Sequence, residues 1–149
     1  MAKTNAWLLS ANKIKLALAQ YELIEIITEP MIYAVPVGPV YCQNMLLWRD
    51  QLLPLIDLEL LSNHLPTIVD KKYYIVVAWQ LKEGEPLHYG ALTLLDLPEN
   101  IVVDDEWQTL LPQNLSEVLS TASLSCFNYD NNAIVIPDLK ALYGEKDGE

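Results

Sequence analysis

Residues 36–58 read Pro36-Val-Gly-Pro-Val-Tyr-Cys-Gln-Asn-Met-Leu-Leu-Trp-Arg-Asp-Gln-Leu-Leu-Pro-Leu-Ile-Asp-Leu58. Two apolar runs, Met45–Trp48 and Leu52–Leu58, are separated by Arg49-Asp50-Gln51, which has the length of a hairpin loop. Asp50 can adopt the left-handed backbone conformation that such a loop needs. The segment therefore predicts a β-hairpin with Arg49 and Asp50 at or near its tip.

The residues before this hairpin predict an ordered, extended connection that follows two strands. Pro30, Pro36, Gly38 and Pro39 lie within ten residues, and proline disfavours both helix and a central sheet position. Upstream, Lys13–Ile27 alternates in places with period two and then becomes rich in β-branched residues. We interpret it as two strands, and a helix over Ala17–Ile26 is the alternative.

Further strands and two short helices are expected after the hairpin. Tyr73–Trp79 is aromatic and β-branched almost throughout, Lys82–Pro86 forms a turn, and Leu87–Leu95 returns as the hairpin partner. Ile101–Val103 and Ala133–Ile136 complete the strands. One short helix is predicted from a capping-box pattern in Asn114–Glu117, and another follows Pro137, with Asp138 near its start and Gly144 just past its end.

The expected architecture is mostly β, with about eight short strands and two or three short helices. Short strands at close spacing favour barrels or a sandwich over a wound α/β sheet. A chain of 149 residues suits one domain, 1–149, or two small fused units. Residues 145–149 are charged and are expected to form a disordered tail.

Charge and composition favour protein or small-molecule partners. The formal net charge is −11, so a nucleic acid backbone or an anionic membrane surface would be repelled. No segment has the ~18 uninterrupted apolar residues of a membrane span, and the N-terminal apolar run is too short for a secretion signal. Cys42 and Cys126 have no cysteine or histidine partner pattern and suggest buried, reduced thiols. We therefore expect a cytoplasmic protein without direct membrane insertion.

The sequence contains no pattern typical of a catalytic, cofactor or metal site. His64 and His88 are the only histidines and are expected to be half-exposed loop or strand residues. Glycine-rich phosphate-binding motifs and nucleophile motifs are absent from the sequence. The acidic stretch Asp104-Asp105-Glu106 is interpreted as solvated loop charge, with a cation site or a docking site for a basic partner as alternatives. We predict that the chain is not an enzyme and has no cofactor.

An excess of apolar and aromatic residues lies in or beside the proline-rich connection. Core packing could account for these side chains, and an exposed subset would make a partner surface. The residues are Tyr33, Val35, Val37, Val40, Tyr41 and Trp48.

Two segments in ungapped register, Leu23-Ile-Glu-Ile26 and 36–58, resemble the signature of the CheW family. That signature runs approximately V-x-E-[VI], then P-x-x-P, then a block ending in P-[VI]-[VI]-D-L. Ile134–Leu142 is similar to the closing strand and helix of the family, and Tyr89–Leu92 resembles one of its strands more loosely. The chain departs from the pattern at three positions. Glycine is usual in the family at the positions of Asn44 and Asp50, and asparagine at that of Leu47.

The resemblance implies two small five-stranded β-barrels packed side by side, with the chain crossing from one to the other and back. It also implies a non-enzymatic adaptor that links the cytoplasmic tip of a chemoreceptor to the regulatory domain of a CheA-type histidine kinase. The pathway would be chemotaxis or the chemosensory control of type IV pili and twitching motility. An alternative within the same fold is a docking domain for a localisation or pilus-motor protein. A small-ligand sensor or an enzyme, with its site between the barrels, is the third possibility.

By the same resemblance, Leu23 and Arg49 lie at the groove that contacts the receptor. Glu25 matches the pattern, and its role could equally be structural. With the neighbouring Trp48 and Asp50 these residues form the candidate partner-binding set. A guanidinium at a hairpin tip can bind a partner carboxylate through two hydrogen bonds. Alternatively, Arg49 could pair locally with Asp50 or Asp57, or contact a backbone carbonyl.

Overall fold

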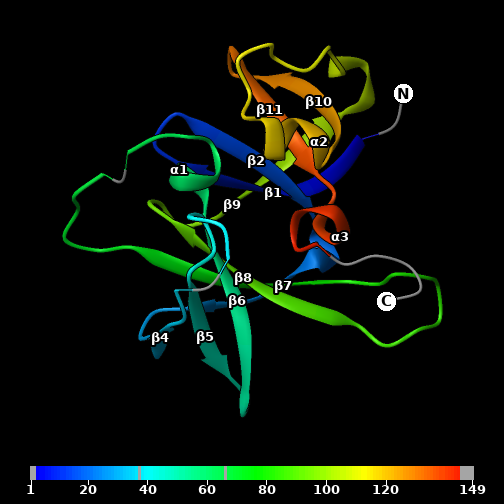
Figure 1. The fold of residues 1–149 in the computed structure, drawn as a ribbon. Coiled ribbons are helices and arrows are strands. Elements are labelled where there is room, and N and C mark those ends of the chain that lie inside the picture. The colour runs from blue at the N-terminus through cyan, green and yellow to red at the C-terminus, as the bar shows by residue number, and fades with distance from the viewer. Residues whose placement is uncertain (1–2, 37, 66, 145–149) are drawn as a thin grey trace.

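The computed structural model describes residues 3–36, 38–65 and 67–144, and within them two β sheets pack against each other with three short helices at their margins (Figure 1). The tail expected at 145–149 lies outside these residues. The mostly-β architecture predicted from the sequence is confirmed. The chain starts in the first sheet, builds the whole second sheet and then returns to complete the first.

The first sheet has the strand order β10-β11-β2-β1-β9. Its strands are β1 (Lys3–Ala11), β2 (Ile14–Ala19), β9 (Glu99–Asp104), β10 (Ser123–Tyr129) and β11 (Asn132–Pro137). Neighbours pair antiparallel except β2 and β11, which run parallel with Leu16 opposite Val135. A bridge between Gln108 and Phe127 joins the segment after β9 to β10, so the sheet curls back toward its own first edge.

The second sheet has the strand order β3-β7-β8-β6-β5-β4. Its strands are β3 (Leu23–Ile27), β4 (Ile32–Ala34), β5 (Asn44–Trp48), β6 (Gln51–Asp57), β7 (Tyr73–Trp79) and β8 (His88–Leu94). The family resemblance implied five strands in each barrel, whereas this sheet has six. One of them, β4, is a strand of three residues within the proline-rich connection that was expected to be extended. Strands β6 and β8 pair in parallel, and the other pairs are antiparallel.

The helices are α1 (Leu58–Leu61), α2 (Glu117–Thr121) and α3 (Leu139–Leu142), and two 3₁₀ turns, η1 (Gln20–Glu22) and η2 (Asp105–Trp107), follow β2 and β9. The two expected helices are present. The N-cap of α2 is Ser116, whose hydroxyl accepts from the Leu119 amide, and not Asn114, where we placed the capping box. Helix α1 was not expected from the sequence, although Asp57 caps it by accepting from the amides of Glu59 and Leu60.

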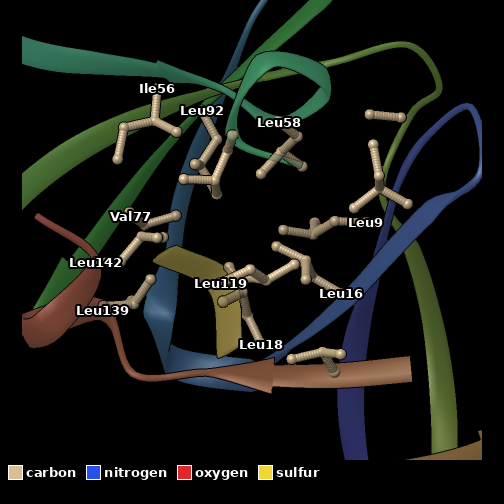
Figure 2. Packing of buried hydrophobic residues seen from close by; sticks show 14 of the residues in the cluster. Leu9, Leu16, Leu18, Ile56, Leu58, Val77, Leu92, Leu119, Leu139 and Leu142 are labelled. Atoms are coloured by element: carbon tan, nitrogen blue, oxygen red, sulfur yellow. The ribbon is translucent and has the colours of Figure 1, made fainter. Parts of the chain in front are cut away.

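The largest core lies between the two sheets. Leu9, Leu16 and Leu18 of the first sheet meet residues of the second sheet that include Ile56, Val77 and Leu92, and helix residues such as Leu119 and Leu139 close the margin (Figure 2). A smaller core lies inside each curled sheet, around Phe127 in the first and Trp48 in the second. Strand β7 is therefore buried on both faces: Ile75 and Val77 face the shared core, and Val76 faces the inner core. This double burial explains the continuous apolar run that predicted the strand.

Several local expectations are confirmed and others are wrong. Lys13–Ile27 forms two strands, β2 and β3, and not a helix. Strands β1 and β10 were absent from the expected set. Cys126 is buried and free as expected, whereas Cys42 is free and only half-buried. Asp104 is not solvated loop charge, because the residue is 6% exposed and its side chain caps η2.

Gly90 marks a close approach between β8 and the C-terminal helix. A Cβ atom at this position would lie 2.5 Å from Cε1 of Tyr143, whose ring covers the glycine. The Tyr143 hydroxyl donates to the Ala91 carbonyl at 2.6 Å, and its ring stacks on Trp79 with centroids 4.8 Å apart. Burial raises the pKa of this phenol well above its usual value, which keeps the hydroxyl a donor. These contacts anchor α3 to the second sheet.

We expect Gly90→Ala to lower the free energy of unfolding by about 1–3 kcal/mol, because the added methyl group must displace a packed ring. Denaturant unfolding measures this change. Tyr143→Ala removes the ring, so Gly90→Ala should cost much less when introduced into that variant. An equal cost in both backgrounds would mean that the ring is not the obstacle.

Glu59 in α1 is 2% exposed and holds the segment before β7 in place. Its carboxylate accepts from the Thr67 amide at 2.9 Å and from the Thr67 hydroxyl at 2.6 Å. Burial alone would raise the pKa of Glu59, but the hydrogen bonds from Thr67, together with Asn12 and the charge of Lys72, outweigh it and lower the pKa below the usual 4.5.

A carboxyl group with a lowered pKa in the folded state stabilises the fold above its unfolded pKa, and this contribution is lost as the pH falls through the folded value. We expect Glu59→Gln to cost about 1–3 kcal/mol at neutral pH. The difference from wild type should shrink below about pH 4.5. Unfolding measured from about pH 7 to about pH 3 checks this, and a difference that does not change with pH would contradict the role of the ionised carboxylate.

Candidate functional site

The predicted hairpin is present and its turn is tighter than expected. Strands β5 and β6 pair directly up to Trp48 and Gln51, so the loop contains only Arg49 and Asp50. Both have positive φ, 47° for Arg49 and 63° for Asp50, as the favoured two-residue hairpin turn requires. An arginine in this conformation is uncommon, and backbone strain of this kind is concentrated at functional sites.

The side chain of Arg49 folds back over the hairpin onto Trp48 and Glu25. Its guanidinium carbon lies 4.4 Å from the centroid of the Trp48 ring, and Nη2 lies 3.5 Å from Oε1 of Glu25. The same oxygen accepts a hydrogen bond from Trp48 Nε1 at 3.1 Å. Glu25 is on β3, so these contacts connect β3 with β5 across the curled second sheet.

The three side chains differ strongly in exposure. Trp48 is 5% exposed and packs its ring against Tyr89, with centroids 5.0 Å apart. The side chains of Arg49 and Glu25 are 68% and 43% exposed. An ion pair this exposed adds little stability, and a cation over an indole adds about 0.5–1 kcal/mol. The arrangement therefore fixes the direction of the guanidinium while leaving most of it open to solvent.

The residues on either side of Glu25 in β3 form an exposed apolar strip, Ile24 and Ile26. A bulge between Leu23 and Glu25 inserts Ile24 as an extra residue, and Ile24 and Ile26 are 36% and 37% exposed. Strand β3 pairs only with β7, so its other edge is free within the described residues. Leu52 on β6 is a further exposed apolar residue, at 50%.

The structure brings together three of the five predicted partner-binding residues: Glu25, Trp48 and Arg49. Leu23 is half-buried two residues before Glu25 and packs against the shared core. Asp50 is exposed at the turn, and its side chain makes no hydrogen bond or ion pair with the described residues. Trp48 is too buried to offer much surface and acts mainly by positioning Glu25 and Arg49. The suggested local partners of Arg49, Asp50 and Asp57, are wrong, because its carboxylate partner is Glu25.

Sequence reasoning missed Tyr89, Ile24 and Ile26. Ile24 and Ile26 belong to the resemblance segment, but the bulge that alters their orientation leaves no clear pattern in the sequence. Among the apolar and aromatic residues in or beside the proline-rich connection, Tyr33, Val35 and Val40 are exposed, at 45%, 38% and 62%. The expectation for Val37 falls outside the described residues.

Within residues 3–36, 38–65 and 67–144, no three histidine, cysteine, aspartate or glutamate side chains gather closely enough to hold a metal ion. None of the helices described is long and apolar enough to cross a membrane. His64 is exposed in the loop after α1, and His88 is half-buried on β8, where its ring stacks on Trp79 at 6.1 Å.

Two curled sheets that share one core make this a mostly-β, two-sheet protein, and the tip of one hairpin presents an exposed arginine. The family model for the CheW-like domain matches residues 6–147. The chain belongs to the CheW-like domain family. Its fold is similar to that of the scaffolding protein TtCheW from Thermoanaerobacter tengcongensis, with a TM-score of 0.75 and 17% identity over 99% of this chain and 97% of that one. A search of curated proteins finds no match.

The turn geometry shows why glycine would suit the position of Asp50, one of the three departures from the family pattern. Asp50 stands where glycine is usual, and its φ of 63° is a conformation that glycine adopts without strain. We expect Asp50→Gly to raise the free energy of unfolding by about 0.5–1 kcal/mol, and Asp50→Ala to lower it, since a Cβ without a local hydrogen-bonding group is disfavoured there. Thermal and denaturant unfolding of both variants test this. Stabilisation by alanine would contradict the turn assignment.

Proposed function

We propose that the chain is a non-enzymatic adaptor of the CheW type that couples chemoreceptors to a CheA-type histidine kinase. The pathway would be chemotaxis or the related control of type IV pili and twitching motility. Membership of the family supports the adaptor role. The proposed place of action is the cytoplasm, with recruitment to receptor arrays or to the cell pole.

The observation that carries the proposal is the preorganised guanidinium of Arg49. The guanidinium lies over the Trp48 ring and forms an ion pair with Glu25, while 68% of the Arg49 side chain remains exposed. A receptor tip that offers a carboxylate beside apolar side chains would meet Arg49 and the strip formed by Ile24 and Ile26. Leu23 lies at the inner end of that strip, on the border of the shared core.

The remaining surface is consistent with a protein partner. The formal net charge of −11 disfavours polyanions, and Arg49 is an exposed cation on a strongly acidic chain. A hairpin tip and an adjacent free strand edge are features that a partner can contact without any rearrangement of the core.

Arg49→Ala tests the assignment. We expect this variant to lose about tenfold or more in affinity for a receptor-tip helical hairpin, because a charge-assisted contact disappears. Affinity for the regulatory domain of a CheA-type kinase should change by less than about twofold. Calorimetric titration of both partners measures these effects.

Lys82→Ala is the matched control, because Lys82 is an exposed cation on the turn between β7 and β8. It should bind both partners as wild type does. Failure of a well-folded wild-type sample to bind the kinase domain would overturn the kinase coupling, and binding to a localisation or pilus-motor protein instead would favour the docking alternative. Equal receptor affinity in the Arg49→Ala variant would overturn the role of Arg49.

A further inference from the structure

A pocket of about 320 Å³ opens between the β1–β2 turn, the segment after α1 and the segment that leads into α2. The first residues of β2 and of β11 supply the rest of its wall. The volume is at the lower end of the range for small-molecule sites. None of the described residues that line the pocket belongs to the β5–β6 hairpin, so it is separate from the Arg49 site.

Two segments that bring basic side chains to this pocket are held beside each other. The Asn12 side chain in the β1–β2 turn donates to the Thr67 hydroxyl at 3.4 Å, and the loop after α1 lies next to that turn (Figure 1). Glu59 holds Thr67 through two hydrogen bonds, and the Glu59 carbonyl accepts from the His64 amide at 2.8 Å. Lys13, which follows Asn12, and His64 therefore reach the pocket from anchored backbone.

Positive charge gathers at this pocket although the chain is strongly acidic. The sequence has twenty acidic and nine Lys or Arg residues, yet the described lining contains Lys13, Lys15 and His64 and no aspartate or glutamate. The Lys15 ammonium is engaged, because it donates to the Ser10 hydroxyl at 3.2 Å. Lys13 and His64 are exposed, and neither side chain has a hydrogen bond or ion pair within residues 3–36, 38–65 and 67–144. The pocket thus offers a free ammonium and a free imidazole to an anion.

A hydroxyl without a partner belongs to the same wall. Ser62 follows α1 as its C-cap, and its Oγ atom is buried and makes no hydrogen bond within the described part of the chain. Buried hydroxyls are nearly always hydrogen-bonded, so this exception needs an explanation. The residue as a whole is only half-buried and lines the pocket. Rotation about its Cα–Cβ bond to another staggered well would bring Oγ toward the pocket, where it could donate to an anion.

The rest of the wall indicates which kind of anion fits. Ile14, Leu115 and Val135 give the pocket an apolar side. The described lining contains no arginine and no glycine, the residues that commonly surround a phosphate group. An inorganic anion would leave the apolar side against water, and a cation would be repelled by the two lysines. An anion with an apolar body matches both sides.

We propose that this pocket binds a small organic carboxylate, with its carboxylate group on Lys13 and His64 and its apolar body against Leu115 and Val135. The site does not rest on the proposed adaptor function. The carboxylate accepts hydrogen bonds from the Lys13 ammonium and from an imidazole N–H of His64. The Ser62 hydroxyl turns to become a third donor, so binding supplies the partner that this group lacks. The apolar body contributes affinity by leaving water.

The test is a titration of the full chain with benzoate. Benzamide is the neutral molecule of nearly the same shape, and inorganic phosphate is an anion without an apolar body. Calorimetry gives the affinities, and amide shifts in the NMR spectrum give the location. We expect benzoate to bind at least about tenfold more tightly than either comparison molecule, with shifts at Lys13, Ser62 and Leu115. Absence of benzoate binding, or equal binding of benzamide or phosphate, would overturn the proposal.

A matched pair of lysine variants separates the pocket from the net charge. Lys13→Ala and Lys82→Ala each remove one exposed cation, but only Lys13 lines the pocket. Lys13→Ala should reduce benzoate affinity about tenfold or more, and Lys82→Ala should change it by less than about twofold. Equal losses in the two variants would mean that benzoate responds only to overall charge, and the site would be wrong.

Ser62→Ala tests the hydroxyl through two readouts. In the free protein it should not lower the melting temperature, because the hydroxyl has no hydrogen bond to lose. It should reduce benzoate affinity about threefold or more. A lower melting temperature or an unchanged benzoate affinity would contradict the role of Ser62 as a donor to the ligand.

Ala133→Leu adds a larger side chain to the pocket wall from β11 and should abolish benzoate binding. Thermal unfolding establishes that each variant is folded before its titration. Wild-type affinity in a folded Ala133→Leu sample would overturn the site. If that variant does not fold, the Lys13→Ala and Lys82→Ala pair decides, because both lysines are exposed and neither is part of a core.

Discussion

Burial of the shared core between the two sheets is the interaction on which the rest of this structure depends. Each fully buried leucine or isoleucine stabilises the fold by about 1.5–3 kcal/mol, and the shared core contains a dozen or so large aliphatic side chains drawn from both sheets and all three helices. Neither sheet has another way to cover the face that it turns toward the other sheet. The small cores around Phe127 and Trp48 are secondary to it. Each fills the interior of one curled sheet, and the shared core holds the two sheets together.

The candidate site follows from this arrangement. Strands with both faces buried, such as β7, cannot carry exposed functional side chains, so function is confined to edges and turns. The β5–β6 turn and the free edge of β3 are such places, and Glu25 bonded to Trp48 holds them together. Arg49 adopts an unfavourable backbone conformation there, which is tolerated because the register of the hairpin permits no other turn.

Much of this could be predicted from the sequence, and the failures have physical causes. Apolar runs with period two or double burial identified β2, β3 and β5–β8, and the ungapped motif identified the family. Strand β1 begins with polar residues, and β10 alternates serine with apolar residues, so neither has a strong pattern. The Asp130-Asn131 turn, with φ of 51° and 62°, was the missed signal for the β10–β11 hairpin. The pairing of Arg49 with Glu25 depends on how the second sheet curls, which no local pattern records.

The parallel pairing of β2 with β11 has a consequence for how the molecule is made. Leu16 meets Val135 in that pair, so β2, which can pair early with β1, gains its other neighbour only when the chain as far as β11 is available. Closing so long a loop delays the contact, and β2 keeps an unpaired edge until then. The second sheet is contiguous in sequence and can assemble first, from the middle of the chain. Chain ends therefore meet last, and the first sheet is the part whose completion is most exposed to competition from aggregation.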